Sequence, residues 1–295
     1  MALQGKVVVI TGASSGIGRA TAHRFAERGA KLVIAARRMG PLDLAVHECA
    51  KLGGQATAVQ ADVTVPDNVE NLARRAVENY GRVDVWVNNA AVALYARVDE
   101  GPLEVHRRVI ETNLLGYLYG SRVAVRIFRQ QGGGVLVNVS SAVAYVGQPY
   151  SSAYVASKFG IRGLTECIRE EVSDYSEIRV CTVMPGATDT PFFQHAGNYI
   201  GRAVQPLKPI ADARRVANVI VAAAERPRRT SFVDIARVLP LLMGIAPGWI
   251  ETYVGKLVKK RQFRDEPAPP SPGNLFEPMM AGDDVSGGWR VSDAK

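Results

Sequence analysis

Short apolar segments rich in valine, isoleucine and alanine recur along the first two thirds of the chain. They are apolar at successive positions rather than at alternate ones, which is typical of strands covered on both faces of a parallel sheet. Longer segments with helical spacing separate them. The predicted strands are Lys6–Thr11, Lys31–Ala36, Gln55–Gln60, Asp84–Asn88, Val135–Ser140 and Ile178–Met184, and the predicted helices are Gly16–Arg28, Pro41–Leu52, Pro66–Tyr80, Leu103–Gln131 and Tyr150–Tyr175.

This alternation of strand and helix predicts an α/β fold, a doubly wound parallel sheet of the Rossmann type. The pattern changes after about residue 236. Val238–Ile250 is apolar but interrupted by prolines and glycines, and Trp249–Arg264 predicts a short amphipathic helix with a basic end. Prolines and glycines from Asp265 onward predict an extended, weakly structured tail. We therefore divide the chain into a domain of residues 1–236 and a C-terminal extension of residues 237–295.

The composition is that of an ordinary globular protein, with 295 residues, 47% hydrophobic and 22% charged, and it excludes disordered, collagen-like and coiled-coil chains. Three scattered cysteines without C-x-x-C spacing predict neither disulfides nor a metal site. Because the sequence shows no leader-like start and no apolar run of about 18 residues, we expect a cytoplasmic protein. The net charge of +8 comes without a nucleic-acid-binding motif, so we expect no nucleic-acid partner.

A glycine-rich loop connects the first predicted strand to the first predicted helix. It reads Thr11-Gly12-Ala13-Ser14-Ser15-Gly16-Ile17-Gly18, with the spacing G-x-x-x-G-x-G. Glycine lets the backbone approach a pyrophosphate closely, and a helix N-terminus offers free N–H groups and a partial positive charge. A tight turn without a ligand is the alternative interpretation. The position between strand and helix favours a dinucleotide site, so residues 1–236 are predicted to be a dinucleotide-binding domain.

The end of the second strand indicates which dinucleotide the loop would hold. Sites of this type usually carry an acid about 20 residues after the loop, on the ribose 2′-hydroxyl. This chain has Arg37 and Arg38 instead, and guanidinium groups can hold a 2′-phosphate by charge-assisted hydrogen bonds. The sequence therefore favours NADP over NAD, with Arg19 and Ser14 as further candidates. The alternative is that one or both of Arg37 and Arg38 face solvent.

A serine, a tyrosine and a lysine have a spacing that suits proton transfer. Ser141 follows a predicted strand, Tyr154 comes thirteen residues later, and Lys158 comes four residues after Tyr154. Residues four apart lie on one face of a helix, so the phenol and the ammonium are neighbours. A nearby cation lowers the pKa of a phenol, which would let Tyr154 exchange protons near neutral pH. The tyrosine–lysine spacing alone is common, and a surface pair is the alternative.

These motifs together resemble those of the classical short-chain dehydrogenase/reductase family, of the type that prefers NADP. The resemblance covers about residues 3–233. It includes the loop at Thr11–Gly18, Asp62-Val63 after the third strand, and Asn88-Asn89-Ala90-Ala91 after the fourth strand. It continues with Asn113, Ser141, Tyr154 and Lys158, and ends with Pro185-Gly186 followed by Thr188 and Thr190.

The resemblance implies a role for each matching residue. Tyr154 would exchange a proton with the substrate oxygen, Ser141 would orient that oxygen, and Lys158 would hold the nicotinamide ribose. Asn113 would support a water that relays protons from Lys158. Asp62 would receive the adenine amino group, and Thr190 with Pro185-Gly186 would contact the carboxamide. The implied cofactor-binding residues are Gly12, Ser14, Ser15, Gly16, Ile17, Gly18, Arg37, Arg38, Asp62, Val63, Asn89, Ala90, Tyr154, Lys158, Pro185, Gly186, Thr188 and Thr190.

The expected reaction is hydride transfer between the nicotinamide and a hydrophobic ketone, aldehyde or secondary alcohol, in the reductive direction. The substrate class follows from the apolar segments that we expect to line the pocket, Ala93–Tyr95, Ala142–Tyr150 and Phe192–Ile210. Core packing is the alternative for several of these side chains.

Two other classes of function stay open: a dinucleotide-sensing regulator without turnover, and a membrane-surface scaffold. The extension suits a segment that covers the substrate pocket or packs against a neighbouring subunit, and secondly a peripheral membrane contact. The resemblance implies a homodimer or homotetramer formed through Leu103–Gln131 and Tyr150–Tyr175.

Overall fold

The computed structural model describes residues 2–290. Its centre is a parallel sheet of seven strands in the order β12-β7-β6-β4-β1-β2-β3. This confirms the predicted fold class. The strands are β1 (Val7–Thr11), β2 (Lys31–Ala36), β3 (Gln55–Gln60), β4 (Val85–Asn88), β6 (Gly134–Val139), β7 (Ile178–Met184) and β12 (Thr230–Phe232).

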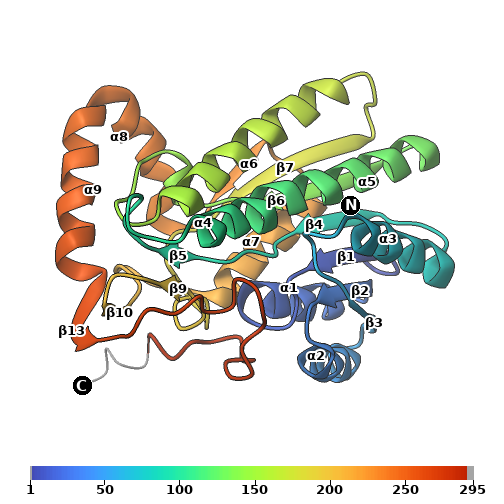
Figure 1. Ribbon diagram of the computed structural model, residues 1–295. Helices are drawn as coiled ribbons and strands as arrows, with labels where there is room; N and C mark the ends of the chain where they lie inside the picture. Colours follow the sequence, from blue (N-terminus) through green and yellow to red (C-terminus); the bar gives the residue numbers. More distant parts are fainter. Residues whose placement is uncertain (1, 291–295) are drawn as a thin grey trace.

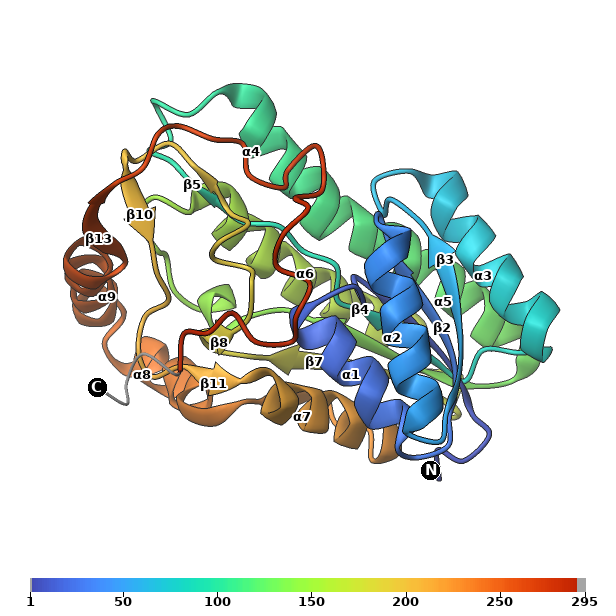
Figure 2. The same cartoon turned by 90° about the horizontal axis from the view of Figure 1, so that it is seen from below.

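Helices cover both faces of the sheet (Figures 1 and 2), which explains why its strands are apolar on both sides. Val8 and Ile10 of β1 pack on one side with α1, α2 and α7, while Val9 packs on the other with α3, α5 and α6. The helices are α1 (Gly16–Ala26), α2 (Met39–Lys51), α7 (Ala213–Glu225), α3 (Pro66–Tyr80), α5 (Gly116–Gln131) and α6 (Ser152–Glu171).

The order of the strands places a ligand site beside β1. From β1 the chain builds β2 and β3 on one side, and then crosses to β4, β6, β7 and β12 on the other. Loops leaving the carboxyl ends of β1 and β4 therefore diverge and open a crevice between them. The glycine-rich loop after β1 lies at this point.

The sequence predicted most of these elements but not all. The bounds of β2, β3, β7 and α3 agree with the predicted ones. The predicted helix Leu103–Gln131 is instead α4 (Leu103–Ile110), a π-helical turn (Glu111–Leu115) and α5. Neither α7 nor β12 was predicted. The start of α7 does carry a sequence signal, the N-cap residue Asp212, whose carboxylate accepts a hydrogen bond from the backbone N–H of Arg214.

Residues after β12 form a helical hairpin and a return strand. A 3₁₀ turn (Asp234–Val238) leads into α8 (Leu239–Ile245) and α9 (Pro247–Arg261), and β13 (Phe263–Pro267) pairs with β10 (Arg202–Val204). Two more short pairs frame the region above the sheet, β5 (Leu94–Tyr95) with β9 (Gly197–Asn198) and β8 (Thr188–Asp189) with β11 (Ala211–Asp212). Among the described residues, no helix is both long and apolar enough to span a membrane.

The segment after β13, residues 268–290, is here called the tail. It contains little regular structure, as predicted, but it is not a free extension. In Figure 2 its dark red trace passes α4 and runs back toward the start of α1 and β8. Backbone bridges join Ser271 to Asn198, and the backbone N–H of Gly16 donates to the carbonyl of Asp284. The tail therefore crosses the crevice at the carboxyl ends of the strands.

Candidate active site

A cavity of about 460 Å³ lies in this crevice, beside the glycine-rich loop. Residues at the ends of β1, β2, β3, β4, β6 and β7 all contribute to its wall. The predicted site residues that line it are Gly12, Ser14, Ser15, Gly16, Ile17, Gly18, Arg37, Arg38, Asp62, Val63, Asn89, Ala90, Ser141, Tyr154, Lys158, Pro185, Gly186, Thr188 and Thr190. The fold thus brings these residues to one cavity, while their individual roles stay predictions.

The glycines of the loop are required by close packing. Gly12 has a φ of +69°, and a Cβ atom there would lie 2.7 Å from the Cα of Ala90. A Cβ on Gly18 would lie 2.1 Å from the carbonyl oxygen of Gly12. With both side chains absent, the first turn of α1 can approach the strand end, and its N–H groups lack helical partners. Ile17 and Gly18 line the cavity at this turn, where an anion would be stabilised.

Asn89 holds the loop in place rather than only lining it. Its side-chain amide donates to the carbonyl oxygens of Thr11, at 3.0 Å, and Gly12, at 3.2 Å. The hydroxyl of Thr11 in turn accepts hydrogen bonds from the backbone N–H groups of Asn89 and Ala90. The strand ends of β1 and β4 are therefore fastened to each other directly below the cavity.

Tyr154, Lys158 and Ser141 meet on the other side of the cavity. Tyr154 and Lys158 lie one turn apart on α6, and the Lys158 Nζ is 5.6 Å from the centre of the Tyr154 ring. Lys158 donates a hydrogen bond of 3.1 Å to the carbonyl of Val139 at the end of β6. The Ser141 hydroxyl hydrogen-bonds with the hydroxyl of Tyr154, and its other two contacts are long, 3.5 Å to the carbonyl of Pro185 and 3.4 Å from the N–H of Val143. It can therefore turn toward a substrate oxygen.

The prediction that Lys158 lowers the pKa of Tyr154 is wrong for the protein by itself. Burial raises the pKa of Tyr154 to about 12, and a hydrogen bond with Ser141 opposes this only in part. Burial also lowers the pKa of Lys158 to about 7, so this lysine carries only a fraction of a charge at neutral pH. The sequence showed the spacing of the two groups but not how deeply the fold buries them.

Asn113 does not line the cavity, although it was predicted as a catalytic residue. It is fully buried in the π-helical turn, a feature common at functional sites. Its carboxamide accepts from the N–H of Val92 at 2.9 Å and donates to the carbonyl of Val92 and to the hydroxyl of Ser157. Its side chain therefore joins the segment after β4 to α6, and the water relay stays a prediction.

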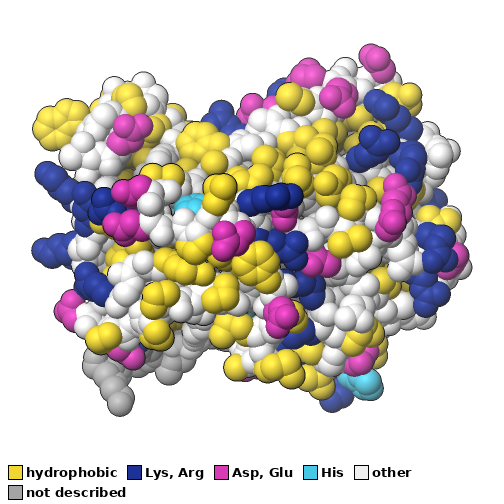
Figure 3. Space-filling model, in the orientation of Figure 1, with side chains coloured by type: hydrophobic (Ala, Val, Ile, Leu, Met, Phe, Trp, Pro, Cys, Tyr) yellow, Lys and Arg dark blue, Asp and Glu magenta, His cyan; other side chains and the backbone are white. Residues whose placement is uncertain are grey.

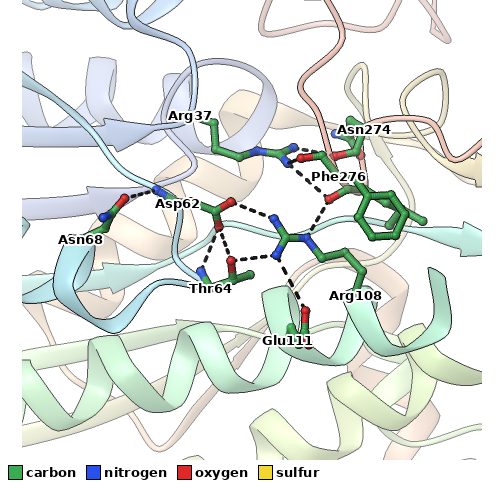
Figure 4. A network of polar contacts seen from close by, with 9 residues as sticks. Arg37, Asp62, Thr64, Asn68, Arg108, Glu111, Asn274 and Phe276 are labelled. Carbon is green, nitrogen blue, oxygen red and sulfur yellow. Dashed lines mark hydrogen bonds and ion pairs between the residues drawn. The ribbon is translucent and has the colours of Figure 1, made fainter. Parts of the chain in front are cut away.

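Arg37 and Arg38 do not face open solvent. Arg37 donates to the carbonyl oxygens of Asn274, at 2.6 Å, Leu275, at 3.3 Å, and Phe276, at 3.0 Å (Figure 4). Arg38 donates to the carbonyl of Met279 at 2.6 Å and pairs with the Asp283 carboxylate at 2.5 Å. Both arginines therefore bind the tail while they also line the cavity.

Asp62 belongs to the same network, through a residue that the sequence analysis missed. Arg108 of α4 pairs with the Asp62 carboxylate at 2.8 Å and also donates to the hydroxyl of Thr64 and the carbonyl of Leu275 (Figure 4). Burial acts to raise the pKa of Asp62, but hydrogen bonds from Thr64 and the charges of Arg108 and Arg37 keep it below its usual value. In the sequence, Arg108 is one of several charged residues of the predicted helix Leu103–Gln131, and no motif distinguishes it.

The substrate side of the cavity is apolar, but its residues differ in part from the predicted ones. Within the predicted segments, Tyr95, Phe192 and Phe193 line it, whereas Leu94, Tyr145, Val146, Tyr199 and Ile200 do not. Tyr145, for example, packs against Phe232. The extension also lines the cavity, through Leu239, Val254 and Leu257 of the hairpin, Gln262 before β13, and Asn274, Pro278 and Met279 of the tail.

The doubly wound sheet, the loop and the Ser141–Tyr154–Lys158 group define a dinucleotide-binding oxidoreductase. A model of the family described as short chain dehydrogenase matches residues 6–199. The chain belongs to this family. It is therefore an oxidoreductase that acts on CH–OH or C=O groups with a nicotinamide cofactor.

Individual relatives agree with this assignment. The chain is 35% identical over 272 residues to the uncharacterized oxidoreductase YxnA of Bacillus subtilis, which covers 91% of this chain and 76% of that protein. It is 38% identical over 194 residues to the 3-oxoacyl-[acyl-carrier-protein] reductase FabG of Thermotoga maritima, covering 65% and 77%. The crystal structure of an alcohol dehydrogenase from the archaeon Thermococcus sibiricus, complexed with 5-hydroxy-NADP, is similar with a TM-score of 0.68 and 29% identity, covering 78% and 95%.

Proposed function

We propose that the protein is an NADP(H)-dependent oxidoreductase that transfers a hydride between the nicotinamide and a hydrophobic ketone, aldehyde or secondary alcohol, in the reductive direction. The observation that carries this proposal is the placement of Tyr154, Ser141 and Lys158 on the wall of one cavity with the glycine-rich loop. The loop fits a dinucleotide because Gly12 and Gly18 leave no Cβ in the way and because Ile17 and Gly18, whose N–H groups have no partner within the helix, line the cavity at the first turn of α1.

The chain's own groups then supply position and proton transfer. The nicotinamide, when bound, supplies or accepts the hydride. The Tyr154 hydroxyl gives its proton to the substrate oxygen or takes it back. Ser141 donates a hydrogen bond where negative charge develops on that oxygen. Lys158, with its pKa lowered to about 7 by burial, can take up and release a proton at neutral pH, which suits a relay that returns the proton to Tyr154.

Arg37 and Arg38 support the choice of NADP. A guanidinium has five N–H donors, and the bonds from Arg37 to the tail use three of them. Arg37 can therefore hold the tail and still offer two N–H donors to a 2′-phosphate in the cavity that it lines. The solved relative with 5-hydroxy-NADP is consistent with this choice.

A hydrophobic substrate is consistent with the apolar side chains that line the cavity beside Tyr154. Phe192 lies 5.7 Å from Tyr154 between ring centres, and Phe193 and Leu257 also line the cavity. FabG, one of the relatives, is named for the reduction of a 3-oxoacyl group, which suits a reductive direction on an apolar carbonyl compound.

The test is oxidation of NADPH with a panel of aliphatic, aromatic and polycyclic carbonyl compounds. We expect turnover with at least one apolar member, and a loss of at least a hundredfold in kcat for Tyr154→Phe. Tyr175→Phe, a change on the surface, serves as the control. If the wild-type protein binds NADPH but reduces no carbonyl compound, the dinucleotide-sensing regulator becomes the better interpretation.

The proposal includes a homodimer or homotetramer built on α4, α5 and α6. Exposed apolar side chains lie on all three helices, Leu103 of α4, Leu118 of α5 and Phe159 of α6. Light scattering of the wild-type protein and of a Leu118→Ser and Phe159→Ser double variant tests this arrangement. We expect the variant to have the smaller mass, and equal masses would contradict it.

A further inference from the structure

The tail contacts the cavity rim at three successive places. Near its start, the side chain of Leu275 is fully buried among Leu94, Val105 and Val109, in a cluster that also includes Tyr154. The backbone carbonyl of Leu275 accepts from both Arg37 and Arg108 (Figure 4). The tail is thus held by an apolar side chain on one side and by two guanidinium groups on the other.

The middle of the tail contacts the loop that would hold the pyrophosphate. The carbonyl of Asp284 accepts from the backbone N–H of Gly16 at 3.0 Å. The carbonyl of Asp283 accepts from Arg19 at 2.7 Å. The ring of His195 is 2.8 Å from the carbonyl of Ala281.

The end of the tail is fixed to the strand that carries Thr188 and Thr190. The carboxylate of Asp189 accepts hydrogen bonds from the Ser286 hydroxyl and from the backbone N–H groups of Gly287 and Trp289. The Trp289 indole donates to the carbonyl of Thr190 at 3.1 Å. These contacts place the tail across the whole crevice, from the end of β2 to β8.

We propose that the tail is a clasp for the cofactor: it forms the outer wall of the adenosine half of the cleft, and a dinucleotide enters or leaves only when residues 274–284 lift. This inference rests on the proposed function. Asn274, Pro278 and Met279 line the same cavity as the loop. The cavity keeps a volume of about 460 Å³ with the tail in place, and the clasp requires that the tail and the dinucleotide occupy the cleft together.

The clasp couples tail and dinucleotide through shared groups. Arg37, Arg38 and Gly16 bind the tail on one side and line the cavity on the other. A ligand that orders these groups therefore strengthens the hold on the tail, and the tail in turn slows release of the ligand. An autoinhibitory tail would have the opposite effect, because its removal would tighten binding.

Two neighbouring substitutions give a matched test. Leu275→Ala removes a fully buried side chain, whereas Phe276→Ala removes one that is 44% exposed and keeps the carbonyl that Arg37 uses. We expect Leu275→Ala to raise the dissociation rate of NADPH, and of NADH, at least tenfold, and Phe276→Ala to change it less than twofold. Trp289→Ala, which removes the indole contact at the other end of the tail, is expected to act like Leu275→Ala.

Hydrogen exchange of residues 271–290 is measured on the same proteins without a dinucleotide, and we expect it to be faster in Leu275→Ala and Trp289→Ala but not in Phe276→Ala. Faster exchange together with an unchanged or slower NADPH dissociation would overturn the clasp. Binding and clasping without turnover of any carbonyl compound would instead overturn the proposed function alone. A protein that binds neither dinucleotide would overturn both.

A separate observation concerns the helical hairpin of α8 and α9. Its outer side exposes four large apolar residues, Leu241 (68% exposed), Ile245 (82%), Trp249 (83%) and Tyr253 (65%). Trp249, Tyr253, Lys256 and Lys260 follow each other at helical spacing along one side of α9. In Figure 3, hydrophobic side chains lie at the upper left of the molecule with Lys and Arg side chains below them. Its inner side lines the cavity through Leu239, Val254 and Leu257.

We infer that this outer side binds the surface of an anionic lipid membrane, from which an apolar substrate reaches the cavity. Tryptophan and tyrosine suit the interface between lipid and water, and lysines near them are attracted to anionic head groups. α9 carries four basic residues and one acidic residue, Glu251. Two copies of the chain meeting at this side would bring these like charges together, which disfavours a second copy as the occupant.

Flotation with vesicles tests this surface. We expect the full chain to float with phosphatidylcholine vesicles that contain phosphatidylglycerol, and at least fivefold less with phosphatidylcholine alone. The double variant Ile245→Ser and Trp249→Ser should lose flotation, while Val98→Ser with Leu44→Ser, which changes exposed apolar residues elsewhere, should keep it. Absence of wild-type flotation would overturn the inference. So would a wild-type dimer, formed without lipid, that the first double variant separates.

Discussion

The ammonium of Lys158 and the hydroxyl of Tyr117 donate to the same acceptor, the carbonyl oxygen of Val139, at 3.1 Å and 2.9 Å. Lys158 also lies 5.3 Å from the centre of the Tyr117 ring. Burial removes the water around the Lys158 ammonium. Among the described residues it has no carboxylate partner, and it contacts the carbonyl of Val139 and the rings of Tyr117 and Tyr154 instead. Its charged form is therefore costly, and its pKa falls to about 7.

The depressed pKa of Lys158 predicts a pH-dependent stability. The unfolded chain binds this proton with the ordinary pKa of 10.5, and the folded protein with a pKa of about 7. Between these values the unfolded state holds more protons, so the lysine's cost to folding is largest below pH 7 and disappears toward pH 10. We expect Lys158→Met to unfold at a higher temperature than wild type at pH 6, with the gap closing by pH 10. An exposed counterpart, Lys51→Met, should show no such trend, and a constant gap for Lys158→Met would contradict the argument.

Gly18→Ala should abolish dinucleotide binding and destabilise the protein. The added Cβ would lie 2.1 Å from the Gly12 carbonyl oxygen, so the loop must move. Gly163→Ala is the matched control, because nothing lies within 4 Å of a Cβ at this position on α6. We expect the control to stabilise the protein by about 0.5–1 kcal/mol through helix propensity. Thermal unfolding and NADPH titration distinguish the two, and unchanged binding in Gly18→Ala would contradict the close packing.

A buried polar chain under α5 and α6 should be costly to break. Asn88 donates to the hydroxyl of Ser121 and to the side-chain oxygen of Asn138, and Asn138 donates to the hydroxyl of Thr165. Asn138→Ala removes the buried hydrogen bonds with Asn88 and Thr165 and leaves a cavity, and we expect a loss of roughly 2–4 kcal/mol in the free energy of unfolding. Asn79→Ala, in an exposed contact, should change it by less than about 0.5 kcal/mol. Urea denaturation measures both free energies of unfolding, and equal losses would show that these buried side-chain hydrogen bonds do not stabilise the protein.

Cofactor choice can be separated from tail anchoring by comparing two variants. Arg37→Ala removes both a candidate 2′-phosphate ligand and a tail contact, whereas Leu275→Ala affects the tail alone. We expect Arg37→Ala to raise the KM for NADPH at least ten times more than the KM for NADH. Leu275→Ala should affect the two KM values equally. If Arg37→Ala also affects both equally, the arginine serves the tail only and the preference for NADP is wrong.

The sheet could be predicted because each strand carries its own local signal. The segments Lys31–Ala36, Gln55–Gln60 and Ile178–Met184 are apolar on both faces and form β2, β3 and β7 with the predicted bounds. The glycine-rich loop and the spacing of Ser141, Tyr154 and Lys158 are local in the same sense. The sequence therefore indicated which residues would gather at one cavity.

What the sequence did not reveal depends on tertiary packing. The pKa of Tyr154 is set by burial rather than by its distance along the chain from Lys158. The hydrogen bonds of Arg37 to Asn274, Leu275 and Phe276 join segments about 240 residues apart, and they are made by backbone carbonyls that any sequence supplies. Prolines and glycines in the tail exclude helix and sheet, but they do not indicate the surface on which an irregular segment lies.

The path of the tail also has a consequence for biosynthesis. Arg37 emerges from the ribosome early, yet the carbonyl of its partner Asn274 is made 237 residues later. The α/β domain can fold as it is synthesised, and its nucleotide cleft is then open on the outer side. A newly synthesised chain can bind a dinucleotide before Leu275 packs into its apolar cluster. The first dinucleotide should therefore bind faster than a dinucleotide is exchanged in the mature enzyme.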